Sequence, residues 1–115
     1  MMRWASMLVQ GIPGAATIEA DRKAFAPYKQ CVMESAQRFA KSTETIDNIS
    51  AATKSVCRSK YAIASMDALD NVMDRNMGNP DKGRGELEGS NVNFATFEKM
   101  LAEDVAALVL NARTQ

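Results

Sequence analysis

The stretch CVMESAQRFAKSTETIDNISAATKSVC (residues 31–57) decides the fold that the sequence predicts. Both flanks have helical apolar spacing, and a few polar residues between them provide a turn. In an antiparallel helical hairpin, residues equally far from the turn lie side by side, and Glu44 is midway between Cys31 and Cys57. We therefore expect the two sulfurs to meet and form a disulfide that links the two helices.

The disulfide has an alternative. In a cytosolic protein, two cysteines are more often small buried thiols than a bonded pair. A bond between Cys31 and Cys57 would instead indicate an oxidising compartment. Closing this loop would contribute about 3–4 kcal/mol, which is a large part of the stability of a small domain.

Composition favours one all-α domain. The chain has 115 residues, enough for a single modest core. Its aromatic content is only 6%, and Ala, Met and Ser are common, which suits helices better than a β-sandwich. We therefore predict a small helical bundle, in which a third helix packs on the disulfide-linked hairpin.

The net charge is zero, which argues against a nucleic-acid-binding surface. The charges are unevenly distributed, however. Residues 1–60 hold nine Lys and Arg against five Asp and Glu, and residues 61–115 hold five against nine. We interpret this polarity as internal complementarity within the fold, because salt screens such fields over about 8–10 Å.

The N-terminal segment MMRWASMLVQGIPGAA (residues 1–16) has the order of a secretory signal. A basic Arg3 precedes a short apolar run from Trp4, and small residues follow. Gln10 interrupts a run that should be longer. The segment is therefore either a degenerate or truncated signal or an N-terminal arm, and residues 17–115 form the helical domain. No stretch is long enough to span a membrane.

Helices are expected in four places. Residues 17–25 form a short helix that Pro27 ends, and residues 27–41 form the first helix of the hairpin. Residues 43–76 form a long second helix, with a break or restart at Ser65. The first hairpin helix has one apolar stripe, formed by Phe25, Tyr28, Val32, Ala36 and Phe39.

The segment MGNPDKGRGELEGSN (residues 77–91) is expected to be a loop, because it combines Gly78, Pro80 and three further glycines with many charges. Asn93 would then cap the last helix, which packs on the second half of the helix before it. Its stripe runs to near the C-terminus and consists of Phe94, Phe97, Leu101, Val105, Leu108 and Ala112.

Motifs for catalysis, metals or cofactors are missing from the sequence. The chain has no histidine, which removes the commonest general base and zinc ligand. A calcium loop starting at Asp74 fails, because Asn79 stands where the loop requires glycine. Glu103 and Asp104 are expected on a solvated helix face. We therefore predict a non-enzymatic protein without a metal or cofactor.

The second helix carries an acidic row. Asp67, Asp70 and Asp74 are spaced three and four residues apart, so they share one helix face. The row is either an ordinary solvated surface or a docking site for a basic partner protein. Methionines could form an adaptable binding groove, but Met66, Met73 and Met100 fit the apolar stripes and are expected in the core.

The segment YKQCVMESAQRFAKSTETIDNISAATKSVCRSKYA resembles small uncharacterised secreted proteins of Gram-negative bacteria. These carry a cysteine near the start of one helix and a second cysteine after an Ala-rich partner helix. The chain is also similar to periplasmic immunity proteins that neutralise peptidoglycan amidase toxins. Both resemblances imply a helical, periplasmic or secreted protein.

Two hypotheses for function follow. The first is a non-enzymatic secreted or periplasmic protein-binding module, of the inhibitor or immunity type, that contacts its partner through Asp67, Asp70, Asp74 and residues 77–91. The second is a cytosolic helical regulator with free thiols, encoded by a phage or mobile element. Counting free thiols distinguishes them, because only the first requires the Cys31–Cys57 bond.

Overall fold

The computed structural model describes residues 15–115, and the predicted N-terminal segment lies outside these residues except for Ala15 and Ala16. The described residues form α-helices joined by turns, without strands. The prediction of an all-α bundle is confirmed, but the expectation of three packed helices is wrong. There are four helices: α2 (Ala15–Phe39), α3 (Ile46–Val56), α4 (Arg58–Arg75) and α5 (Pro80–Arg113).

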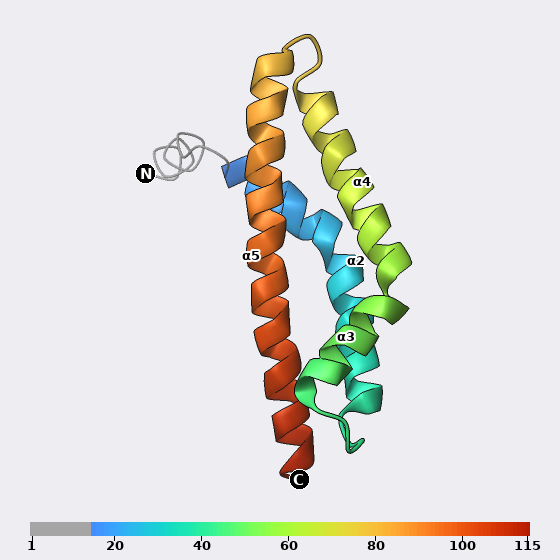
Figure 1. Cartoon of the computed structure of the whole chain (residues 1–115). Helices are drawn as coiled ribbons and strands as arrows, with labels where there is room; N and C mark the ends of the chain where they lie inside the picture. The colour runs from blue at the N-terminus through green and yellow to red at the C-terminus, as the bar shows by residue number, and fades with distance from the viewer. Residues whose placement is uncertain (1–14) are drawn as a thin grey trace, which may run out of the picture.

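Helix α5 runs along the whole length of the bundle, and α2, α3 and α4 lie beside it (Figure 1). We expected the last helix to pack on the second half of the helix before it. Instead, α5 makes its largest contact with α2, and α4 also packs more on α2 than on α5. Helix α2 is therefore the central element of the fold.

The two cysteines are bonded. Their sulfurs are 2.12 Å apart and their Cα atoms 5.9 Å apart, as predicted. Cys57 is fully buried, and it is the residue that separates α3 from α4. The break expected at Ser65 is therefore wrong. Ser65 lies exposed within α4, whose backbone hydrogen bonds continue past it because nothing there caps or ties the chain.

Pro27 does not end a helix, and α2 continues through it. The proline removes one backbone hydrogen bond, but Phe25 and Tyr28 on either side are 3% and 2% exposed. Burial of these two rings outweighs the local cost of the proline. The ribbon of α2 changes direction along its length, as expected of a helix with an internal proline (Figure 1).

The predicted loop over residues 77–91 is also wrong, because α5 already begins at Pro80. The side chain of Asn79 caps this helix by accepting a hydrogen bond from the Lys82 N–H at 3.3 Å. Pro80 occupies the first turn, where its missing N–H costs nothing, and Asp81 complements the helix dipole. Three good start residues therefore outweigh the glycines that follow.

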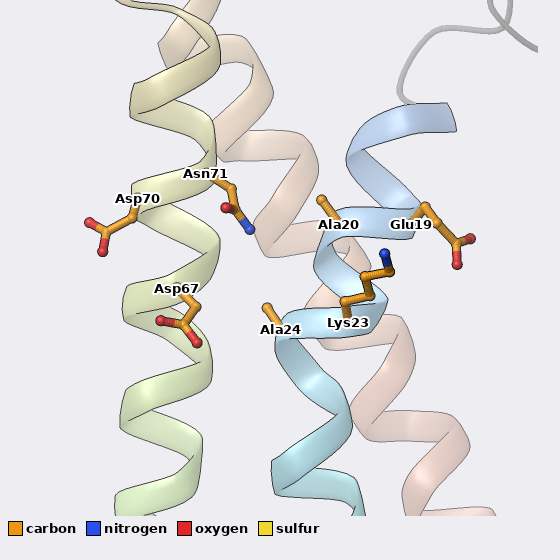
Figure 2. Close-up of a pocket in the computed structure, with 7 residues that line it drawn as sticks. All are labelled: Glu19, Ala20, Lys23, Ala24, Asp67, Asp70 and Asn71. Atoms are coloured by element: carbon orange, nitrogen blue, oxygen red, sulfur yellow. The ribbon is translucent and has the colours of Figure 1, made fainter.

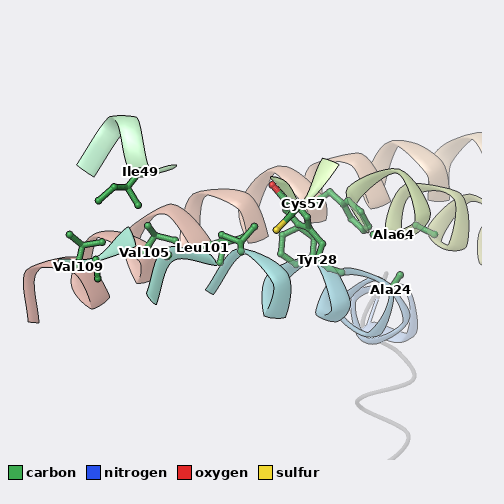
Figure 3. Close-up of a cluster of buried hydrophobic side chains, with 14 residues drawn as sticks. Ala24, Tyr28, Ile49, Cys57, Ala64, Leu101, Val105 and Val109 are labelled. Carbon is green, nitrogen blue, oxygen red and sulfur yellow. The ribbon is translucent and has the colours of Figure 1, made fainter. Parts of the chain in front are cut away.

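The core is a narrow line of side chains between α2 and its three neighbours. Figure 3 shows it running from Val109 and Ile49 at one end to Ala64 and Ala24 at the other. Aromatic rings fill its middle, where Tyr28 lies 4.9 Å from Tyr61 between ring centroids. Burial raises the pKa of Tyr28 to about 12, and the nearby Glu98 adds to this shift.

The predicted stripes are largely correct. On α2, Phe25, Tyr28, Val32 and Ala36 are buried, while Phe39 at the helix end is 38% exposed. On α5, the whole predicted stripe contributes to the core. Its buried members are Phe94, Leu101 and Val105, and its partly buried members are Phe97, Leu108 and Ala112.

A buried carboxylate joins α2 to α5. Asp21 is 0% exposed and accepts hydrogen bonds from the Ser90 hydroxyl and the Asn93 amide, each at 2.9 Å. The sequence predicts Asn93 as the cap of the last helix, and this prediction is wrong. Asn93 lies within α5, where its side-chain amide donates a hydrogen bond to Asp21. These contacts fix how the two helices are aligned, because a carboxylate buried here without its donors would be costly.

Candidate functional site

Packing of α4 on α2 determines where the acidic row points. Ala64, Ala68 and Val72, four residues apart, are 1–4% exposed and form the inner face of α4. This spacing fixes the rotation of the helix about its axis. Asp67, Asp70 and Asp74 consequently lie on the solvent side, and all three are exposed. The structure places the three aspartates on one exposed face, and their role in binding stays a prediction.

An open groove of about 650 Å³ lies between α2 and α4, beside this row. Figure 2 shows Asn71 and the small Ala20 and Ala24 between the two helices, with Asp67 at the mouth. Asp70 points away from α2, toward the outer surface of α4 (Figure 2). The remaining lining residues, Glu19 and Lys23, come from α2.

The acidic row forms no ion pair within the described part of the chain. Among residues 15–115, no ion pair involves Asp67, Asp70 or Asp74, whereas Glu19 across the groove pairs with Arg22 at 2.7 Å. Like charges at these helical spacings destabilise a helix by about 0.2–0.5 kcal/mol per pair. The row therefore costs stability, and no ion pair among residues 15–115 offsets this cost, although Lys23 of α2 lines the same groove.

Long apolar side chains lie next to the acidic row. Met66, Leu69 and Met73 on α4 are 64%, 40% and 61% exposed, and Met77 in the following turn is 85% exposed. We call these four residues the methionine face. The prediction that Met66, Met73 and Met100 belong to the core is wrong, since Met100 is also 55% exposed.

The reason is that α4 has two competing apolar stripes. The Ala64–Ala68 pair lets α2 approach closely, so the inner stripe is made of small residues. The larger side chains, which hydropathy favours, are then left outside. The alanines four residues apart were the pattern in the sequence that could have identified the inner face.

An apolar pocket continues from the methionine face. It has a volume of about 590 Å³ and lies between the end of α4 and the start of α5. Leu69, Met73 and Met77 line it from one side, and Pro80 and Leu87 line it from the other. Exposed apolar surface of this kind is typical of binding sites.

The structure also shows where the carboxylates lie that could serve in catalysis or metal binding. Glu103 and Asp104 are exposed on α5, as predicted. Within residues 15–115, no three His, Cys, Asp or Glu side chains lie close enough to hold a metal ion. The residues after Asp74 do not form a calcium-binding loop. Glu86 and Glu88 belong to helix α5, and the Glu86 carboxylate accepts a hydrogen bond from the Asn76 side chain.

None of the helices described here combines the length and apolar content that a membrane span requires. Comparison of the chain with protein-family models, curated proteins and solved structures finds no match.

Proposed function

We propose that this protein is a non-catalytic binding module that recognises a basic segment of another protein through Asp67, Asp70 and Asp74. One observation carries this proposal. Three exposed carboxylates follow one another along α4 beside an open groove, and no ion pair within residues 15–115 neutralises any of them. A surface that costs the fold stability is best explained by a partner that supplies the missing cations.

A secreted or periplasmic inhibitor or immunity-type role is the form of this proposal that agrees with the cysteines. The Cys31–Cys57 bond supports an oxidising compartment. Intact mass after alkylation without reductant tests this point in protein isolated from its native host. We expect no alkyl group to be added, whereas two added groups would favour the cytosolic regulator with free thiols.

The acidic row is tested by capture from extracts of the native host. We expect the wild-type chain, immobilised on beads, to retain a partner that the D67K/D70K variant loses almost completely, because reversed charges repel basic side chains. The matched control is E103K/D104K, which changes the same number of exposed carboxylates on α5 and should capture as the wild type does.

Equal retention by all three proteins would rule out the acidic row as the contact surface. Circular dichroism of the variants checks that the helices are intact. Exposed substitutions of this kind usually change stability by no more than about 0.5 kcal/mol.

A further inference from the structure

We infer that the segment recognised by α4 is a basic amphipathic helix, whose apolar side covers the methionine face while its lysines and arginines meet the acidic row. This inference rests on the proposed function, since it names the class of partner for the same surface. It adds a second set of contacts, those of Met66, Leu69, Met73 and Met77.

The methionine face offers an apolar surface to solvent. Met66, Met73 and Met77 are more than half exposed; the first two lie on the outer side of α4 and Met77 lies in the turn that follows it. Methionine side chains are flexible and polarisable, so they adapt to the apolar side chains of a partner. Leu69 and Met73 lead from this face into the 590 Å³ pocket, which gives a partner side chain room to enter.

The acidic row lies beside the methionine face on α4. Asp70 is four residues after Met66, and Asp74 follows Met73, so the carboxylates flank the methionines along one side. Figure 2 shows Asp70 directed away from α2 rather than into the groove. An apolar strip with one acidic edge is complementary to an apolar strip with one basic edge.

The dimensions of the two strips match a short helix. Met66 and Met73 are separated by about 10 Å of helical rise along α4, which is two turns. Helical ligands commonly place an apolar stripe at this spacing against an exposed apolar surface. An extended basic peptide would meet the acidic row equally well, but its same-face side chains are alternate residues about 7 Å apart, whereas residues seven apart on a helix reproduce the two-turn spacing of Met66 and Met73.

A second copy of this chain is a poorer occupant. Two α4 helices brought face to face would set one acidic row near another. Arg75, the cation that follows these aspartates on α4, already lies 3.7 Å from Glu86 of α5. Charge complementarity therefore favours a basic partner over self-association.

Fluorescence anisotropy with three labelled peptides tests the inference on the full chain. The first peptide has about 18 residues, or five helical turns, of leucine and lysine, with leucines at helical spacing. The second has the same composition in an order that spreads the leucines around the helix. The third is a lysine peptide of the same length without leucine. We expect the first to bind at least tenfold more tightly than the other two.

Variants on α4 separate the two halves of the site. M66Q/M73Q should weaken binding of the amphipathic peptide about tenfold, because apolar contact area is lost. D67N/D70N should weaken binding of all three peptides and reduce the dependence of binding on salt. The matched controls on α5, M100Q and E103Q/D104N, change equally exposed side chains and should bind as the wild type does.

Each outcome decides between the two proposals. If D67N/D70N weakens binding and M66Q/M73Q does not, the acidic row stands and the amphipathic helix is overturned. If neither variant matters, both proposals fail. Equal affinity for the two leucine-containing peptides would also overturn the helix.

Two further measurements exclude other occupants. Sedimentation of the free protein should show one mass at all concentrations. A dimer that M66Q/M73Q dissociates would assign the methionine face to a second copy. Trp4 is the one tryptophan of the chain, so its emission reports on residues 1–14. We expect the same emission from the wild type and M66Q/M73Q, and a shift would assign the face to this chain's own first residues.

Discussion

The two ends of the bundle are stabilised in different ways. The cystine end comprises α3, the second half of α2 and the second half of α5. Its core contains Ile49, Val105 and Val109, each 0–2% exposed, beside the Cys31–Cys57 bond. The other end, which we call the hairpin end after the pair of helices α4 and α5 that meet at Gly78, comprises α4, the first half of α5 and the first half of α2. There the inner face of α4 is mostly alanine, and Asp21 aligns the helices through hydrogen bonds.

This difference explains why the large apolar side chains of α4 are exposed. At the cystine end, Arg113 near the C-terminus donates hydrogen bonds to the carbonyls of Ala40, at 3.0 Å, and Ser42, at 2.8 Å, so α5 is also held to the turn after α2. At the hairpin end, the small inner residues leave Met66, Leu69 and Met73 outside. The two ends therefore differ in what holds them: a covalent bond and large buried side chains at one end, and alanine packing with polar contacts at the other.

Removing the disulfide should have the largest effect. We expect C31A/C57A to lower the free energy of unfolding by about 3–4 kcal/mol, because the unfolded chain regains the freedom of a loop between cysteines 26 residues apart. The melting temperature would fall by about 15 °C. Thermal unfolding followed by circular dichroism measures both quantities.

Reductant is the control for this experiment. It should shift the wild type to the melting temperature of the variant and leave the variant unchanged. A loss below about 1 kcal/mol would contradict the comparison, since the cystine end would then be held by its side-chain packing alone.

Replacing Asp21 should have the next largest effect and should act on the other end. We expect D21A to cost about 2–3 kcal/mol, because the Ser90 hydroxyl and the Asn93 amide lose their acceptor in a buried position. Urea unfolding measures the change. D104A removes an exposed carboxylate from α5 and should stay within about 0.5 kcal/mol of the wild type. A neutral D21A would mean that alanine packing, and not the polar contacts, aligns α2 with α5.

Much of the cystine end could be predicted from the sequence, because its determinants are local or symmetric. Cys31 and Cys57 are equally far from a turn, and the stripe from Phe25 to Ala36 has one periodicity. Asp21 could not be found in this way. Its partners are 69 and 72 residues away along the chain, so no short pattern connects them.

The acidic row was predicted as one helix face because spacing alone fixes it, whereas the methionine face was missed. Periodicity detects an apolar stripe but does not tell which of two stripes on α4 faces the core. Ala64 and Ala68 face the core because their small side chains let α2 and α4 pack closely.

The sequence predicts a loop where α5 begins, because glycines are frequent there. The N-cap Asn79 starts the helix in spite of them. Gly85 and Gly89 lie within the helix, and a Cβ added at either position would meet nothing within 4 Å. We expect G85A and G89A each to raise the free energy of unfolding by about 0.5–1 kcal/mol, because alanine favours the helix more than glycine does. Urea unfolding of each variant checks this smallest effect.

Gly78 supplies the matched control in the turn that precedes α5. Its φ of 85° suits glycine, so G78A should lower stability by about 1–2 kcal/mol although no atom blocks the added Cβ. If G85A and G89A stabilise while G78A destabilises, helix propensity is what limits the hairpin end. If G85A and G89A were neutral, the Asp21 contacts would already hold this part of α5, and the two ends would differ less in stability than in the kind of contact that provides it.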